Sequence, residues 1–279
     1  MEIKINPVPN VSFLLITFYL DFDLLKNQLD SVRLYLKDHT QYPYTIVLND
    51  DIRYLPELER IISHYPEMTF NLLHKNNYSN RYVDPILNDP DNTSQVALTR
   101  KTKNNILLGF GFFTQQMLKI VSATEVKTEY CIIVDTKCAW NRLIDLNTFI
   151  YNNKMHTMPL HNEYKNNNIT LARIKVAYQA FDLELTPSMI DRVRDFSTPF
   201  LIKTKYATDL ITYLENKEIF VNDLIYCKNN WDRQTFEFFI YSAWIEKYCN
   251  EDLFEEDLVI GHKLKSYCTH NKHPLQRNW

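Results

Sequence analysis

The sequence predicts an α/β protein in which helices cover a mainly parallel sheet. Three observations support this fold class: a length of 279 residues, a hydrophobic content of 45%, and short apolar runs that alternate with segments of helical periodicity. A chain of this length buries a substantial core, as one large domain or two small ones. Alternation of strand-length and helix-length segments is typical of βαβ units, which build parallel sheets.

The first strand is predicted at residues 11–18, VSFLLITF, because the run is apolar and rich in β-branched and aromatic residues. A helix is predicted at residues 21–37, with Asp21 suited to its N-cap. The residues on its apolar side are Leu24, Leu25, Gln28, Leu29, Val32 and Leu36.

The same alternation continues with a strand at 44–48, a helix at 55–64 and a strand at 68–73. Residues 75–103 interrupt it with a segment rich in Asn, Asp and Pro. A long irregular insertion of this kind is either a functional loop or a disordered one.

The second half of the chain is less regular. We predict a helix at 111–121 and a strand at 130–134, followed by an Asn-rich connection at 152–168. Further elements are a strand at 198–202 and helices at 205–215 and 236–248. We find no internal repeat and no clean linker, and therefore expect one domain that is elaborated in its C-terminal half.

The charge, the apolar segments and the cysteines of the sequence exclude some classes of protein. A net charge of −3 argues against a surface dedicated to coating nucleic acid, although not against a local basic patch. No segment approaches the roughly 20 continuous apolar residues of a membrane span. The first residues lack the apolar core of a signal peptide, so we expect a cytoplasmic location. The five cysteines form no CxxC pair and are odd in number, which favours reduced structural thiols.

Polar residues follow three of the predicted strands. Thr17 and Tyr19 follow the first strand, Asp50 the second, and Asp135 and Lys137 the strand at 130–134. Ligands of open α/β sheets bind at the carboxyl ends of the strands, so these positions predict a site for a polar ligand. Helix capping and turn chemistry explain acids such as Asp50 equally well.

The segment Asp135-Thr136-Lys137 is the most informative of these strand ends. An Asp-x-Asp at this place holds a divalent metal on a sugar diphosphate, because Mg²⁺ and Mn²⁺ prefer carboxylate and phosphate oxygens. Lys137 stands where the second carboxylate would be. Either Lys137 itself neutralises a diphosphate or Asp135 alone holds a metal. A surface Asp–Lys pair is the plainer alternative, and we favour a binding site because the motif follows a buried strand.

The segment GFGFFT at 109–114 contains two of the three glycines of the chain. It lacks the third glycine of a dinucleotide fingerprint and has no convincing strand before it, so it predicts only a tight turn before a helix. Gln115, Gln116 and Lys119 lie on that helix. Gln115 and Lys119 share a face by their i, i+4 spacing, so that one can hold a substrate while the other is solvated.

The order of these segments resembles GT-A-type glycosyltransferases. More narrowly, it is similar to a poorly characterised bacterial and phage group that has a QQxxK helix, here residues 115–119, and an LDxK strand end in place of Asp-x-Asp, here Val134-Asp135-Thr136-Lys137. The resemblance extends to Thr198-Pro199-Phe200 and to TFEFFIYSAW at 235–244. It covers most of residues 11–245.

This resemblance implies a GT-A-like fold, with a mixed, mainly parallel sheet flanked by helices. Residues 1–140 would bind the nucleotide sugar, residues 141–260 would form the acceptor side, and residues 261–279 would be a tail that closes over the site. The implied activity is transfer of a sugar from a nucleotide-diphosphate sugar to a hydroxyl acceptor, a glycan or polysaccharide.

The resemblance also implies roles for the residues at the strand ends and on the following helix. Thr17, Tyr19 and Asp50 would border the nucleoside, and Gln115 and Lys119 would add contacts and charge from the helix.

The diphosphate would be held by Asp135 and Lys137, directly or through Mn²⁺ or Mg²⁺. The replacement of the second Asp by Lys137 makes metal-independent binding an equal option. His262, in the tail, is a second candidate metal ligand, although solvated tail histidines are the plainer explanation for it, His270 and His273.

By the same resemblance, Glu237 faces the acceptor and is the candidate general base. It lies among aromatic residues, and an aromatic setting raises the pKa of a carboxyl group, which suits acid–base work. Spacing alone favours a different interpretation, in which Glu237 is exposed on an amphipathic core helix.

Three other functions stay open from the sequence. The acceptor could be a modified DNA base if the source is viral, and the basic residues of the 81–103 segment would then meet phosphate. The chain could be a non-catalytic carbohydrate- or partner-binding protein on a degenerate transferase scaffold. It could also be a nucleotidyltransferase, which releases pyrophosphate. The sequence does not specify the donor, the stereochemistry or the oligomeric state.

Overall fold

A computed structural model describes residues 10–78, 82, 101–102, 105–106, 110–146, 149–151, 154–155, 160–219, 221–225, 235–249 and 268–270. Most of the predicted loop at 75–103 lies outside these ranges. The predicted tail at 261–279 is described only at residues 268–270, so His262 and His273 lie outside the described residues.

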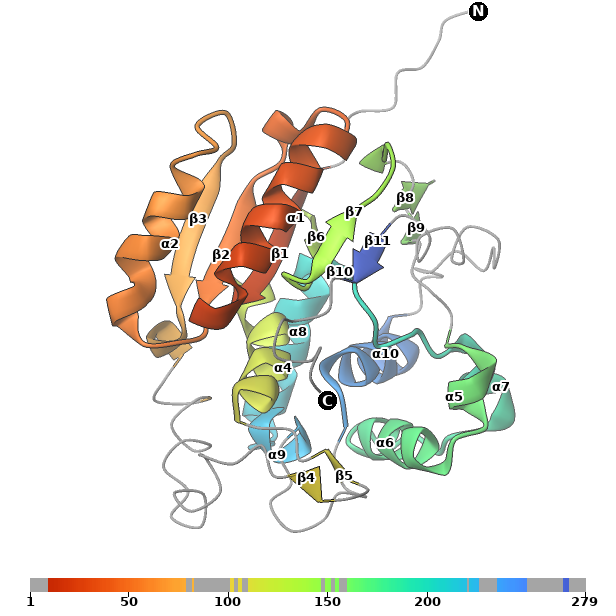
Figure 1. Cartoon of the computed structure of the whole chain (residues 1–279). Helices are drawn as coiled ribbons and strands as arrows, with labels where there is room; N and C mark the ends of the chain where they lie inside the picture. Colours follow the sequence, from red (N-terminus) through yellow and green to blue (C-terminus); the bar gives the residue numbers. More distant parts are fainter. Residues whose placement is uncertain are drawn as a thin grey trace, which may run out of the picture.

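The centre of the molecule is a five-stranded mixed sheet with the order β10-β6-β1-β2-β3 (Figure 1). Four of its strands are parallel, and β10 pairs antiparallel with β6 at one edge. This confirms the predicted mixed, mainly parallel sheet. The strands span β1 Val11–Thr17, β2 Tyr44–Leu48, β3 Phe70–His74, β6 Tyr130–Ile133 and β10 Phe200–Lys203.

The apolar runs in the sequence become the central strands because both faces of the sheet are covered. Every residue of β1, β2 and β6 is buried. A strand that is buried on both faces reads as a continuous apolar run rather than as an alternation, and parallel strands are usually of this kind. The strand β3 lies at the other edge and is only partly buried.

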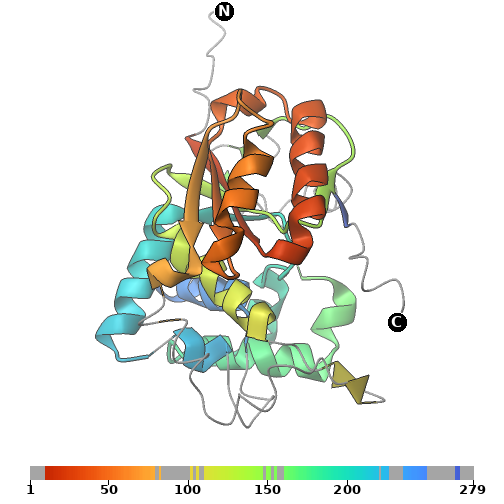
Figure 2. The same ribbon diagram turned by 60° about the vertical axis from the view of Figure 1, so that its left-hand side comes forward.

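Helices flank this sheet, and Figures 1 and 2 show α1 and α2 on one face of it. The helix α4 packs against β1 and also against α8 and α10, which form a helical layer together with α6. The helices of these two groups span α1 Phe22–Tyr35, α2 Leu55–Ile62, α4 Phe110–Ala123, α6 Asn168–Gln179, α8 Thr204–Asn216 and α10 Glu237–Tyr248.

The predicted elements and the described ones agree closely in the first half of the chain. The helix α6 was not predicted, because residues 152–168 suggested only an irregular connection. Its first turn is capped by Asn167, whose side chain accepts hydrogen bonds from the backbone N–H of Ile169 and Thr170 at 2.9 and 3.1 Å. The Asn-rich segment therefore ends in a helix start.

The strand β7, Cys138–Trp140, follows Lys137 and pairs antiparallel with β11, Cys268–His270. Part of the predicted tail therefore returns to the polypeptide segment that carries Asp135. The thiols of Cys131 and Cys138 are buried and that of Cys249 is half-buried, and none of the three forms a disulfide, as predicted.

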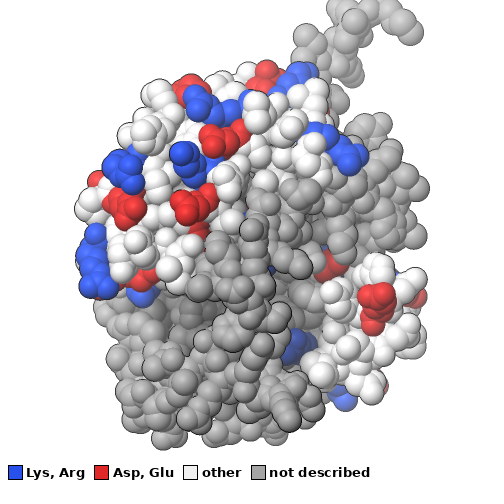
Figure 3. All heavy atoms as spheres, viewed as in Figure 1, with Lys and Arg blue, Asp and Glu red and all other residues white. Residues whose placement is uncertain are grey.

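Two surface properties of the described residues bear on the class of partner. None of the described helices is both long and apolar enough to cross a bilayer. On the face shown in Figure 3, Lys and Arg side chains alternate with Asp and Glu side chains over α1 and α2. The described part of this face therefore carries mixed charge rather than a field of one sign.

Candidate active site

The chain makes a tight turn at residues 135–138, directly after β6. Val134 N–H still donates to Leu14 of β1 at 3.0 Å, but the backbone of Cys138 already bonds back to Asp135 at 2.9 Å. Thr136 Oγ1 donates to Asp21 Oδ2 at 3.0 Å. These bonds hold residues 135–138 against β1 and the start of α1, so that the Asp135 side chain leaves the sheet at its carboxyl edge.

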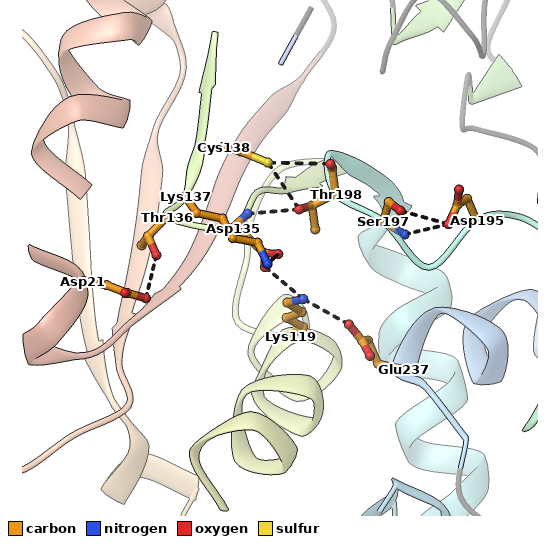
Figure 4. Close-up of polar contacts among 10 residues, drawn as sticks. All are labelled: Asp21, Lys119, Asp135, Thr136, Lys137, Cys138, Asp195, Ser197, Thr198 and Glu237. Carbon is orange, nitrogen blue, oxygen red and sulfur yellow. Dashed lines mark hydrogen bonds and ion pairs between the residues drawn. The ribbon is translucent and has the colours of Figure 1, made fainter. Parts of the chain in front are cut away.

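Asp135, Lys119 and Glu237 form one buried ionic cluster (Figure 4). Lys119 Nζ lies 3.0 Å from Asp135 Oδ1 and 3.2 Å from Glu237 Oε1. The exposed fractions of these side chains are 5% for Lys119, 16% for Asp135 and 1% for Glu237. We refer to these three residues as the charged cluster. It joins three elements that are distant in the sequence, the end of β6, α4 and α10.

Lys119 and Glu237 are positioned by the helices α4 and α10. Lys119 lies on the buried side of α4, and its ammonium is also 5.3 Å from the centre of the Phe238 ring. Glu237 is the first residue of α10, after Phe236 at the N-cap. A carboxylate at that position is stabilised by the unpaired N–H groups of the first helical turn.

Burial is the largest influence on the pKa of each member of the cluster. It raises the pKa of Glu237 from an ordinary 4.5 to about 7, although Lys119 acts in the opposite direction. Burial also favours neutral Asp135, but Lys119 and Lys137 outweigh it and hold the pKa of Asp135 below its ordinary value. Burial disfavours charged Lys119, yet the two carboxyl groups outweigh it and raise the pKa of Lys119.

These directions fix the charges near neutral pH. Lys119 is an ammonium and Asp135 is a carboxylate, whereas Glu237 is close to its midpoint of titration. A carboxyl group with a pKa near the working pH is suited to accept and return a proton. The expectation of a raised pKa in an aromatic setting is therefore met, while the alternative of an exposed Glu237 is wrong.

Gln116 is the fourth member of this neighbourhood, and the sequence analysis did not select it as a binding residue. Its side chain is buried. When its carboxamide is oriented with Nε2 toward Glu237, it donates to both carboxylate oxygens. Gln115, which the i, i+4 argument placed beside Lys119, is half-buried. The i, i+3 spacing of Gln116 and Lys119 was the signal that pointed to the buried pair.

Lys137 lies at the edge of the cluster. Its side chain is 50% exposed, and its Nζ is 3.8 Å from Asp135 Oδ2. The two oxygens of Asp135 thus face two different ammonium groups, one buried and one open to solvent. Lys137 is the cation of this site that a ligand from solution meets first.

The ends of β1 and β2 form a second polar region. Tyr19 N–H donates to Asp50 Oδ2 at 3.0 Å, and Asp51 N–H donates to Asp50 Oδ1 at 2.8 Å. The Tyr19 ring is 39% exposed and stacks on Tyr54 with the ring centres 4.2 Å apart. Thr17 is fully buried, and its hydroxyl has no hydrogen-bond partner among the described residues. We refer to Tyr19, Asp50, Asp51 and Tyr54 as the strand-end rim.

Asp21, at the N-cap position of α1, makes no side-chain capping bond to the helix and instead accepts from Thr136. Asp50 behaves as the turn explanation proposed, because both of its oxygens accept backbone N–H groups. The ring of His74, from β3, bonds to the carbonyl of Asp50 at 2.8 Å and accepts from Asn76 N–H at 3.2 Å. This pattern puts the imidazole proton on Nε2.

The described residues do not fit a divalent metal at Asp135. A metal needs several free oxygen ligands, but Lys119 lies against both Asp135 and Glu237, and Lys137 lies beside Asp135. Within the described ranges, no group of three or more His, Cys, Asp or Glu side chains is arranged to hold a metal ion. His262 falls outside those ranges.

Neither of two hollows that described residues line includes the charged cluster. One, of about 430 Å³, lies between α4, α8 and residues 76–78. The other, of about 700 Å³, lies between α6 and residues 182–190. The assignment of the site therefore depends on the position, burial and charge of the cluster at the strand ends.

Comparison with known proteins gives one family and several solved structures. The model of a family of unknown function, DUF6492, matches residues 17–259. No protein with a curated description matches the sequence.

The similar solved structures include glycosyltransferases. Apo mouse xyloside xylosyltransferase 1 has a TM-score of 0.47 and 7% identity, over 88% of this chain and 84% of that one. The mannosyltransferase Ktr4p from S. cerevisiae has a TM-score of 0.45 and 9% identity, over 76% and 62%. The mannosyltransferase PcManGT from Pyrobaculum calidifontis, in complex with GDP-Man and Mn²⁺, has a TM-score of 0.34 and 9% identity, over 61% and 40%. Likenesses this distant support no argument about the chemistry of this chain.

Proposed function

For this chain, which belongs to the family of unknown function DUF6492, we propose transfer of a sugar from a nucleotide-diphosphate sugar to a hydroxyl acceptor. One observation carries the proposal: a buried Lys119 shared by Asp135 and Glu237 at the carboxyl edge of a mainly parallel sheet. Buried ionisable groups with shifted pKa values cluster at functional sites. The ammonium charge suits the departure of a diphosphate, and the carboxylate of Glu237 suits the loss of a proton from a hydroxyl.

The donor would lie across the strand ends, with its diphosphate next to Lys137. That ammonium is half-exposed and only weakly engaged by Asp135 at 3.8 Å, so it has hydrogen-bond donors for phosphate oxygens. The nucleoside would extend over the strand-end rim, where the Tyr19 ring offers a partly exposed aromatic face. Bases stack on such rings with little dependence on base identity. Asp50 and Gln115 would complete the proposed donor side, whereas Thr17 is fully buried beneath it.

The transfer step forms a bond between the acceptor oxygen and the anomeric carbon and breaks the bond from that carbon to the diphosphate. Glu237 would take the hydroxyl proton, because its pKa of about 7 leaves part of it ionised near neutral pH. Gln116 donates to this carboxylate, so the acceptor hydroxyl has to replace that amide during reaction. The departing diphosphate would gain its stabilisation from Lys137 and from the adjacent ammonium of Lys119.

The same cluster is consistent with the proposed division of the chain. Lys119 and Asp135 come from residues 1–140, and Glu237 comes from residues 141–260. Donor and acceptor sides would therefore meet at the ionic bonds of Lys119. We propose a glycan as the acceptor, since the net charge of −3 is not the basic balance that favours a DNA acceptor.

The test is incubation of the purified chain with a panel of nucleotide sugars, with the nucleotide product identified by chromatography. Release of a nucleoside diphosphate, by transfer or slow hydrolysis, supports a glycosyltransferase. Release of pyrophosphate would identify a nucleotidyltransferase instead. Asp135→Ala and Glu237→Ala variants that remain folded should lose turnover. Sugar binding without turnover of any donor would contradict the proposal and favour a non-catalytic binding protein.

A further inference from the structure

We infer that Lys119 is a resident cation that occupies the place of a divalent metal between Asp135 and Glu237, so that a nucleoside diphosphate binds without any metal ion. This inference rests on the proposed function for its ligand. It goes beyond that function, because it states which charge replaces the metal and where. The cation that replaces the metal is therefore Lys119 on α4, and not Lys137, the residue that the sequence motif indicated.

A single buried ammonium engages both carboxylates of the charged cluster. The ammonium of Lys119 lies within 3.2 Å of an oxygen of each, and its side chain is almost entirely buried. Glu237 also receives hydrogen bonds from the Gln116 carboxamide. One oxygen of each acid therefore already faces an ammonium, which leaves few carboxylate oxygens for the several short bonds that Mg²⁺ or Mn²⁺ requires.

Electrostatic repulsion by Lys119 and Lys137 also disfavours a metal ion at Asp135. A metal on the remaining oxygen of Asp135 would stand beside Lys137, whose Nζ is 3.8 Å from that oxygen, and near the buried ammonium of Lys119. Like charges in such positions disfavour each other strongly, because the interior screens them less than water does. Lys137, beside Asp135, is half-exposed, so the open side of this carboxylate presents an ammonium, which attracts an anion rather than a second cation.

The neighbouring described acids accept hydrogen bonds from other groups of the protein. Asp21 accepts from Thr136, and Asp50 accepts two backbone N–H groups. Neither is left to complete a metal shell with Asp135. The described residues therefore offer a fixed cation in a built ionic setting and no set of metal ligands.

The first experiment needs no nucleotide and no turnover. Binding of Mn²⁺ to the chain is measured by electron paramagnetic resonance for wild type, Lys137→Asp and Lys119→Ala. Lys137→Asp restores an Asp-x-Asp at a half-exposed position that should tolerate the change, and Lys119→Ala removes the resident cation. Lys127→Asp, at the opposite end of β6, is the control for the change in charge.

We expect no Mn²⁺ signal from Asp135 in wild type or in Lys127→Asp. We expect at least a tenfold gain in Mn²⁺ affinity in folded Lys119→Ala, and a smaller gain in Lys137→Asp, which keeps Lys119 between the two carboxylates. Wild-type binding of Mn²⁺ that is abolished by Asp135→Asn would overturn the inference. So would a gain in Lys137→Asp that equals or exceeds the gain in a folded Lys119→Ala variant.

The second experiment measures the affinity for UDP and GDP by calorimetry, in EDTA and in Mn²⁺. We expect equal affinities in the two buffers for wild type, and tighter binding in Mn²⁺ than in EDTA for a folded Lys119→Ala variant. Wild-type binding that requires Mn²⁺ would overturn the resident cation while leaving the proposed function intact. If neither nucleotide binds in either buffer, the proposed function and the metal-free binding both fail.

Discussion

The charged cluster and the strand-end rim lie at the same edge of one sheet, yet they differ in the environment of their acids. Asp135 and Glu237 are largely shielded from solvent and share a buried ammonium. Asp50 and Asp51, in the rim, are closer to solvent and bond to backbone N–H groups. Burial raises the pKa of Glu237, whereas for Asp135 the opposite effect of Lys119 and Lys137 outweighs burial and lowers the pKa. The lesson is that a carboxylate after a strand indicates chemistry mainly when the fold also removes it from water.

Substitution of Lys119 should have the largest effect of any single change at this edge. Lys119→Met leaves two carboxyl groups buried without their cation, and breaking a buried ionic contact from one side costs about 3–5 kcal/mol. We expect that loss in the free energy of unfolding, measured by urea denaturation at pH 7, together with loss of turnover.

The matched control is Lys137→Met, which removes the half-exposed neighbour of the same aspartate. It should lower the free energy of unfolding by about 1 kcal/mol or less, because exposed ion pairs contribute little. Equal losses for the two variants would mean that Lys119 is no more shielded from solvent than Lys137.

The second-largest expected effect is a change of the free energy of unfolding with pH, which is caused by Glu237. Its pKa is raised from 4.5 to about 7 on folding, so between these values the folded chain binds more protons than the unfolded chain. The free energy of unfolding should therefore fall as pH rises from about 4.5 to about 7, by at most about 3 kcal/mol from this group.

Glu237→Gln has no proton to lose, so this decline should be missing from its pH profile in denaturation experiments. The contribution of Asp135 has the opposite sign, since its pKa is lowered on folding. That contribution is lost only as pH falls below the ordinary value of an aspartate, outside the window of Glu237. Parallel profiles for wild type and Glu237→Gln between pH 5 and 7 would show that Glu237 is not buried as described.

A smaller effect is expected in the rim. Asp50→Ala removes the acceptor for Tyr19 N–H and Asp51 N–H, and both donors can turn to water. We expect a loss of about 1 kcal/mol in the free energy of unfolding. The same variant should weaken the binding of a nucleoside diphosphate, measured by thermal shift, because the Tyr19 ring loses its backbone anchor. Unchanged nucleotide affinity would remove the rim from the donor site.

Much of the sheet follows from the sequence because its strands are buried on both faces. The run at 11–18 and the run at 44–48 are continuous in apolar character and became β1 and β2 with almost the predicted bounds. The helix α6 was missed because its start is a polar Asn-rich segment. The signal for it was local, an Asn at the N-cap followed by helix-compatible residues.

The candidate site was less predictable, for a physical reason. Periodicity suggested an exposed Glu237 on an amphipathic helix, but every residue of α10 from Glu237 to Ile245 is buried. A helix that is covered all round has no polar face from which exposure can be inferred. The contact of Lys119 with Asp135 and Glu237 depends on tertiary packing of three distant segments, which no local pattern encodes.

The central claim is that a nucleotide sugar binds at the end of β6, beside the charged cluster. A crystal structure of the chain soaked with UDP or GDP tests it most directly. The account predicts a diphosphate in contact with Lys137 and a base against the ring of Tyr19. A nucleotide bound on another face, with Lys137 free in solvent, would contradict it.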